Sequence, residues 1–465
     1  MIKAALRLQV RTVLRSPARL LGVVFVLAVG LFVVWQGGQD VARWNEAIAQ
    51  GRRAEAETIE EARALLKAGE AGPAQRPWVD LHRAAWQDRY AAVRLAKRPA
   101  PLAGIAFASA DATPAVQRID RRADPMIAAG SRIENPALVV TGGLDLVTVL
   151  SLLLPLCVVA LGVDVGGYER ASGVLSLVRV QSGDDLRWIR ARCIAVGVLV
   201  AGLGLLLVVS ATVVLGGAAE DALRFSALVL AYVAVWTALM SLVATVARHP
   251  SHGAIALGVA WMALCVLVPA VAAERSASLV AEDFALDLTV ERRNARGRAA
   301  ELDADAVWSV VTARFPSLAA EATSPDPSVA DDARDVVRLV DLEARLGARE
   351  QRGGAQRQLV ERASISTPTV AFASALERLA GRGPVASLAF RRAVIEAAAA
   401  RAEETLARRL RDVPLGLSDF DALVASSPTH VEPPAPGITF ELAILLGWTL
   451  ALLGAGAWLG RRPSR

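Results

Sequence analysis

The chain is poor in lysine, and it lacks the short motifs that carry several common reactions. Lysine occurs only at Lys3, Lys67 and Lys97, and none of the three follows a glycine. The sequence therefore contains no G-x-x-x-x-G-K-[ST] phosphate-binding loop and cannot hydrolyse ATP by that route. The zinc-protease pattern H-E-x-x-H and the hydrolase pattern G-x-S-x-G are missing as well. We predict that the chain holds no catalytic residues.

Cysteine and histidine are also scarce. Cys157, Cys193 and Cys265 lie in or beside apolar blocks, so we expect no disulfide framework in the polar segments. The four histidines are dispersed; His249 and His252 could share a helix face, but a turn between two spans is a poor place for a structural metal. The net charge of +5 is small for 465 residues. We expect neither a metal site nor a nucleic-acid partner.

Apolar residues are abundant and segregated. Hydrophobic residues make up 54% of the chain and mean hydropathy is +0.41, although 21% of residues are charged. A bilayer-spanning helix needs about 20 apolar residues, and six stretches qualify: 18–36, 143–163, 193–215, 224–247, 253–273 and 439–459. We predict an all-α membrane protein with six transmembrane helices. The first stretch is not followed by a convincing cleavage pattern, which favours a retained anchor over a signal peptide.

The charges of the short flanks predict the orientation. The first 19 residues contain five basic residues and no acid, and the tail at 460–465 contains three and no acid, whereas the turn at 216–223 carries two acids. The positive-inside rule then places both termini in the cytoplasm of a bacterial inner membrane. Residues 37–142 and 274–438 would form two large, mostly helical extracytoplasmic segments, and 164–192 would form the longest cytoplasmic loop.

Residue patterns predict the elements of the two exported segments. The first should contain helices at 39–67 and 78–97, followed by a loop with a short strand near 102–109. The second should be helical at 274–320, 328–363, 369–382 and 385–412, and should end in a proline-rich tether at 423–437.

The N-terminal stretch, 1–17, is amphipathic at helical spacing. Its basic residues recur every four positions, at Lys3, Arg7, Arg11 and Arg15, opposite a mainly apolar face. Such a helix directly before a span should lie in the lipid headgroup plane. The alternative is a set of scattered arginines that serves only as a topology signal.

One stretch around the second span resembles ABC-2-type transporter permeases. That family carries Asn-Pro, Gly and Asp before the span, Leu-Pro within it, and Glu-Arg-x-x-Gly-Thr-Leu after it. The matching residues here are Asn135, Pro136, Gly143, Asp145, Leu154, Pro155, Glu169, Arg170, Gly173 and Leu175, with Val174 in place of the threonine. The two long inserts, and Thr367-Pro368 followed by Leu-Ala-Gly, resemble the branch with an uncharacterised exported region, related to the permease for nitrous-oxide-reductase maturation.

The resemblance implies a partner set. The spans would form half of a transmembrane pathway, and a second copy or a paralogous permease would supply the other half. Two separate ATPase subunits, which bind ATP and Mg²⁺, would dock on the cytoplasmic face and drive export. A periplasmic partner is a further expectation, and this chain itself would bind no cofactor.

The same resemblance, with the topology, predicts the site residues. Those that would couple to the ATPases are Tyr168, Glu169, Arg170, Gly173, Val174, Leu175, Arg187 and Arg190, and the pathway candidates are Asp145 and Pro155. Each has a plainer interpretation: Glu169 and Arg170 as local charge placement at a helix end, and Asp145 as a helix cap. A membrane-anchored scaffold without translocation is the alternative function. An ion-driven transporter is not favoured, because no acid or histidine lies at mid-span.

Overall fold

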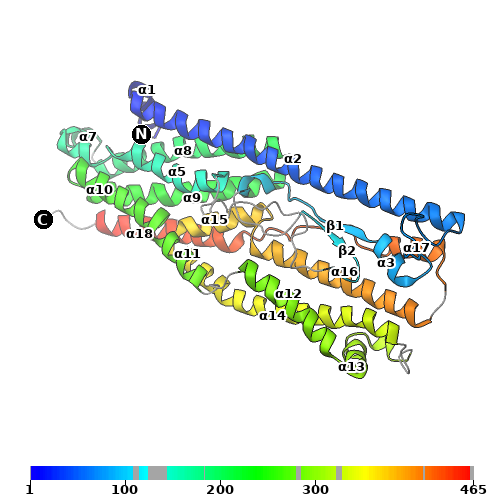
Figure 1. The fold of residues 1–465 in the computed structure, drawn as a ribbon. Coiled ribbons are helices and arrows are strands. Elements are labelled where there is room, and N and C mark those ends of the chain that lie inside the picture. The colour runs from blue at the N-terminus through cyan, green and yellow to red at the C-terminus, as the bar shows by residue number, and fades with distance from the viewer. Residues whose placement is uncertain are drawn as a thin grey trace.

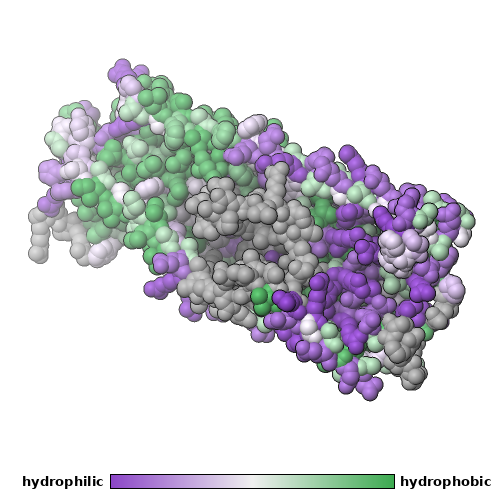
Figure 2. Space-filling model, viewed as in Figure 1, coloured by the Kyte–Doolittle hydropathy of each residue, from purple (hydrophilic) through white to green (hydrophobic). Residues whose placement is uncertain are grey.

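The molecule is elongated, with a helical bundle at one end and a second, mostly helical region at the other (Figure 1). In the space-filling view, the surface of the bundle is mostly hydrophobic and that of the other end is mostly hydrophilic (Figure 2). The computed structural model describes residues 2–107, 115–123, 144–182, 184–278, 284–320, 327–411 and 414–460. The predicted motif residues Asn135, Pro136 and Gly143, and the tail beyond Gly460, lie outside the described residues.

Six helices in the described part of the chain are long and apolar enough to cross a membrane, as predicted. One of them, the fifth, contains a π-helical turn, η2, between α10 and α11. Side chains such as Val33, Leu150 and Leu228 from different helices form one shared core. The elements are α2 (Pro17–Ala68), α5 (Leu146–Gly162), α8 (Asp185–Leu215), α9 (Ala219–Val246), α10 (Pro250–Trp261), η2 (Met262–Leu267), α11 (Val268–Ser278) and α18 (Thr439–Gly460).

The first spanning helix does not stop at residue 36. Helix α2 runs unbroken for 52 residues, about 78 Å at 1.5 Å per residue, whereas a bilayer core is about 30 Å thick. The predicted helix at 39–67 is therefore its continuation. Helix α2 begins at Pro17, and proline is a favoured first helical residue. It ends at Ala68, and Gly69, with φ of 73°, forms its C-cap. Helix α1 (Ile2–Arg15) precedes it.

The region at the far end, here called the polar domain, comprises the described parts of residues 39–123 and 284–438 except α15 and the short turn η1 (Ala103–Ala106), whose Ile105 packs in the bundle core. Its helices are α3 (Ala84–Tyr90), α12 (Phe284–Glu301), α13 (Ala304–Arg314), η3 (Pro316–Leu318), α14 (Pro327–Ser366), α16 (Pro384–Arg411) and α17 (Leu417–Ala425). A small sheet of order β2-β1-β3 joins β1 (Val93–Lys97) to β2 (Val116–Ile119) antiparallel and to β3 (His430–Val431) parallel.

Three sequence predictions for the two polar segments fail. The predicted helix at 78–97 is helical only over Ala84–Tyr90 and continues as strand β1. The predicted strand near 102–109 is instead a short 3₁₀ turn, and the predicted tether contributes strand β3. The reason is tertiary packing: Val93 and Leu95 enter a core with Trp308, which local propensity does not encode.

The two polar segments fold together. One core combines Val93 and Ile119 of the first segment with Trp308 and Phe390 of the second. Another places the distal end of α2 against α17, through residues such as Leu66, Tyr90 and Phe420. The segments between spans one and two and between spans five and six therefore build a single domain.

Candidate functional site

The predicted coupling motif begins with a tight turn after α5. Gly166 has φ of 83°, and a Cβ there would overlap the carbonyl oxygen of Ala244. Glycine thus lets helix α6 (Gly167–Ala171) lie against the end of α9. Gly173, with φ of 75°, then turns the chain into α7 (Val174–Ser182). Helices α6 and α7 are at the same end of the bundle as α1 (Figure 1).

Arg170 caps the C-terminal end of α9. Its guanidinium donates to the carbonyl oxygens of Ala244 at 2.8 Å and Thr245 at 2.9 Å, and also to that of Ala247. The last carbonyls of a helix have no intrahelical donor, and a cation there is favoured by the helix dipole. This contact joins the motif firmly to the fourth spanning helix.

Glu169 lies inside the protein, with 7% of the residue exposed. Its Oε1 accepts from Arg192 Nε at 3.1 Å, and Arg192 Nη1 donates to Gln9 Oε1 at 2.6 Å. Gln9 Nε2 in turn donates to the carbonyl of Leu161 at 2.9 Å. This buried network of Gln9, Glu169 and Arg192 connects α1, α5, α6 and α8. Arg192 was predicted only as one of three arginines that lead from the loop into span three. Gln9 and the buried pairing of Glu169 with Arg192 were not predicted, and the signal was a polar Gln9 on the apolar face of α1.

Four large apolar side chains are exposed on α6 and α7, beside polar ones such as Ser176 and Arg179. We call Tyr168, Val174, Leu177 and Val180 the exposed apolar patch; Val180 is 86% and Tyr168 57% exposed. Of the predicted coupling residues, Tyr168 and Val174 belong to it, whereas Glu169, Arg170 and Leu175 are wholly or partly buried beneath it. The remaining basic residues from the prediction are exposed on α1 and on the first turns of α8: Lys3, Arg7, Arg11, Arg15, Arg187 and Arg190.

Helix α15 (Pro368–Leu379) enters the bundle. It was predicted, as part of 369–382, to belong to an exported segment, but it packs among α5, α9 and α18 (Figure 1). Its Phe372 ring stacks on Tyr232 with 4.2 Å between centroids and 4° between planes. Helix α14 ends just before it, so α14 and α15 meet at Thr367 in a hairpin whose tip lies inside the bundle.

The hairpin tip lies beside α5, which contains Pro155. Proline has no N–H, so the carbonyl of Ser151, one turn earlier, lacks its usual donor. Tyr232 supplies one, with its hydroxyl 2.8 Å from that carbonyl and 3.0 Å from Thr369 Oγ1. Pro155, predicted as a pathway residue, thus creates the acceptor that helps hold α15 in place; its role in transport stays a prediction.

Charged groups collect where α15 leaves the bundle. Asp145 caps α5, accepting from the N–H and the hydroxyl of Thr148, both at 2.8 Å. Arg378 of α15 forms an ion pair with the buried Glu441 of α18. Burial and the nearby Asp145 carboxylate raise the pKa of Glu377 to about 7. The capping interpretation of Asp145 fits this geometry, and its pathway role stays a prediction.

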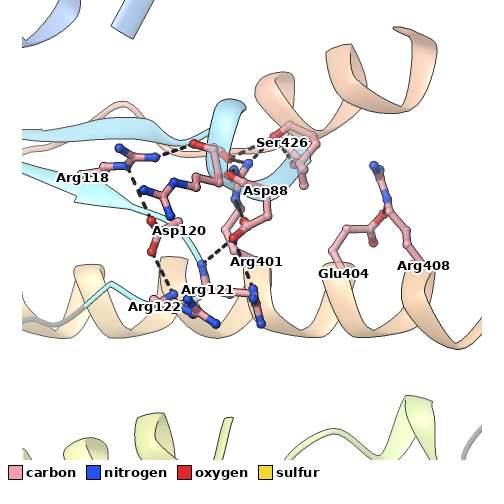
Figure 3. Close-up of polar contacts among 12 residues, drawn as sticks. Asp88, Arg118, Asp120, Arg121, Arg122, Arg401, Glu404, Arg408 and Ser426 are labelled. Carbon is pink, nitrogen blue, oxygen red and sulfur yellow. Dashed lines mark hydrogen bonds and ion pairs between the residues drawn. The ribbon is translucent and has the colours of Figure 1, made fainter. Parts of the chain in front are cut away.

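A second buried ion network lies in the polar domain (Figure 3). Asp88 of α3 accepts from Arg401 Nε of α16 at 3.0 Å and from the N–H of Arg121 at 3.0 Å. Arg121 also pairs with Asp332 and Asp335 of α14, at 2.6 and 2.8 Å. Burial raises the pKa of Asp88, while the positive charge of Arg401 opposes that shift. These contacts join the two polar segments, and we assign them a structural role.

The described residues contain no group of three or more histidine, cysteine or acidic side chains that could hold a metal ion. Comparison with known proteins finds no matching family model, no matching curated protein and no matching solved structure. The resemblance to ABC-2-type permeases therefore stays a prediction based on the motif residues.

Proposed function

We propose that this chain is the membrane-spanning permease subunit of a transporter driven by ATP that separate ATPase subunits hydrolyse. The observation that carries the proposal is the exposed apolar patch on α6 and α7. An exposed apolar patch at the α1 end of a bundle is typical of a protein–protein contact. Positive-inside counting predicts that this patch faces the cytoplasm, where an ATPase carrying ATP and Mg²⁺ would meet it.

The anchoring of the motif supports a mechanical role. Arg170 attaches α6 to the end of α9, and the network of Glu169, Arg192 and Gln9 attaches it to α8 and α1. A push on Tyr168 or Val180 would therefore be transmitted to several spanning helices rather than absorbed by a loose loop. In this proposal Glu169 and Arg170 transmit force from beneath the contact, and the exposed apolar side chains receive it.

The hairpin of α14 and α15 supports a link to the polar domain. Because α15 packs against α5, α9 and α18, movement of those helices would shift α14 and hence the polar domain. We propose that a second copy of this chain, or a paralogous permease, completes the pathway in a bacterial inner membrane, and that the polar domain faces the periplasm. Export is the direction that we propose.

Affinity purification of the tagged full chain from its native membrane tests the proposal. We expect an ATPase subunit to co-purify and the complex to hydrolyse MgATP. The double variant Leu177→Glu/Val180→Glu should reduce the recovered ATPase at least tenfold, whereas Trp78→Glu, an equally exposed apolar residue of the polar domain, should not. If the wild-type chain brings down periplasmic proteins but no ATPase, the scaffold function replaces the transporter.

A further inference from the structure

A basic pocket lies where the start of α1 meets the first turns of α8. It has a volume of about 460 Å³. Its lining combines cations with apolar side chains: Ile2, Lys3, Arg187, Arg190, Ala191 and Ile194. The four α8 residues recur at helical spacing and form one stripe of that helix, and the packing of Ala5 on Ala191 holds α1 against it.

The three cations of this pocket have no acidic partner among the described residues. The two nearby carboxylates are engaged elsewhere: Asp184 accepts from the backbone N–H of Arg187, and Asp185 pairs with Arg179. The side chains of Lys3, Arg187 and Arg190 are exposed and point their charge to the same pocket. Three unneutralised cations from two helices favour an anionic ligand.

A mostly apolar cavity, here called the groove, lies beside this pocket. It has a volume of about 190 Å³ between α9 and α18, shares Arg190 with the pocket, and is lined by apolar residues such as Leu242, Leu453 and Gly456 together with Ser241 and Thr245. Ile194, 43% exposed, adds apolar surface below the cations. A charged pocket that shares Arg190 with a mostly apolar groove between spanning helices matches a molecule with an anionic head and a hydrocarbon tail.

We propose that this pocket binds one anionic phospholipid, with its phosphate between Lys3, Arg187 and Arg190 and one acyl chain in the groove between α9 and α18. Basic pockets at the cytoplasmic ends of spanning helices are suited to such headgroups. The site requires that the six helices cross a membrane, but it does not require an ATPase. It would hold α1 against α8, next to the buried network.

Native mass spectrometry of the full chain, released from nanodiscs of phosphatidylglycerol mixed with phosphatidylcholine, tests the site. We expect one retained phosphatidylglycerol per chain. The variant Lys3→Gln/Arg187→Gln/Arg190→Gln should weaken that retention on the order of a hundredfold, since each cation contributes about fivefold. The matched control Arg7→Gln/Arg11→Gln/Arg15→Gln removes the same charge from exposed positions of α1 that do not line the pocket, and should change retention less than threefold.

A second variant separates the tail from the head. Gly456→Leu places side-chain atoms in the groove and leaves the cations unchanged, so it should reduce retention of a lipid with long chains but not of one with six-carbon chains. Equal losses of retention in the two triple variants would overturn the proposal. Equal retention of phosphatidylglycerol and phosphatidylcholine by the wild type would overturn it as well. Displacement by millimolar inorganic phosphate would also overturn it, by indicating a site for the free anion.

Discussion

Removing one partner of the buried Glu169–Arg192 pair should unfold the α1 end of the bundle more readily than removing both. The two side chains are 9% and 7% exposed, so a single replacement leaves one charge buried without its partner. Such a loss costs about 3–5 kcal/mol. We expect that penalty for Glu169→Leu and for Arg192→Met.

The double variant should be less damaging than either single one. With both charges gone, the main remaining defect is Gln9, whose Oε1 loses its donor. An unsatisfied buried polar atom costs about 1–3 kcal/mol. The two single variants and the double variant therefore form a double-mutant cycle, whose coupling energy should be several kcal/mol. Two independent surface residues would show no such coupling energy.

Equilibrium unfolding of the detergent-solubilised full chain in mixed micelles, followed by tryptophan fluorescence, measures these free energies. Arg179→Met is the matched control, because it breaks an ion pair whose arginine side chain is 70% exposed, and should cost under about 1 kcal/mol. Additive losses in the double variant would refute the coupling. ATP turnover of Glu169→Ala should then be measured on folded protein only, so that lost stability is not mistaken for lost coupling.

Three further predictions concern other parts of the chain, each measured by unfolding of the full chain. The pKa of Glu377 is raised from 4.5 to about 7 in the folded protein, so ionising this side chain lowers the free energy of unfolding as pH rises through that range. Glu377→Gln should therefore be more stable than wild type by up to about 3 kcal/mol at pH 8. At pH 4 it should be no more stable than wild type. Tyr232→Phe removes the hydroxyl donor to a buried carbonyl and should cost about 1–3 kcal/mol, whereas the exposed Tyr168→Phe should cost nothing measurable. Arg401→Met leaves a carboxylate buried in the polar domain and should cost about 3–5 kcal/mol, against under about 1 kcal/mol for Arg98→Met in an exposed pair.

Local patterns in the sequence predicted the features that depend on local composition. The six spans follow from apolar runs of about 20 residues, and α1 follows from basic residues at four-residue spacing. The sequence left two interpretations of Asp145, a helix cap and a pathway residue, and the geometry supports the cap. Each of these depends on residues within a few turns of one another.

Contacts between distant residues were not accessible in this way. Gln9 and Arg192 are 183 positions apart, and only the fold brings them together. Helix α15 is 12 residues long and carries Glu377 and Arg378, so hydropathy did not place it in the bundle. Strand β1 exists because its partners come from residues after 115 and near 430. A single sequence carries no local record of such pairings.

The length of α2 has a mechanical consequence. Where the helix leaves the bundle, Gly37 lies directly against Gly104, with no room for a side chain between the backbones. From that contact to Ala68 the helix extends about 46 Å. If the contact acts as a fulcrum, a tilt of only about 5° would carry the distal end through about 4 Å, roughly the rise of three helical residues. A small rearrangement among the spanning helices would thus be delivered, amplified, to the tip of the polar domain.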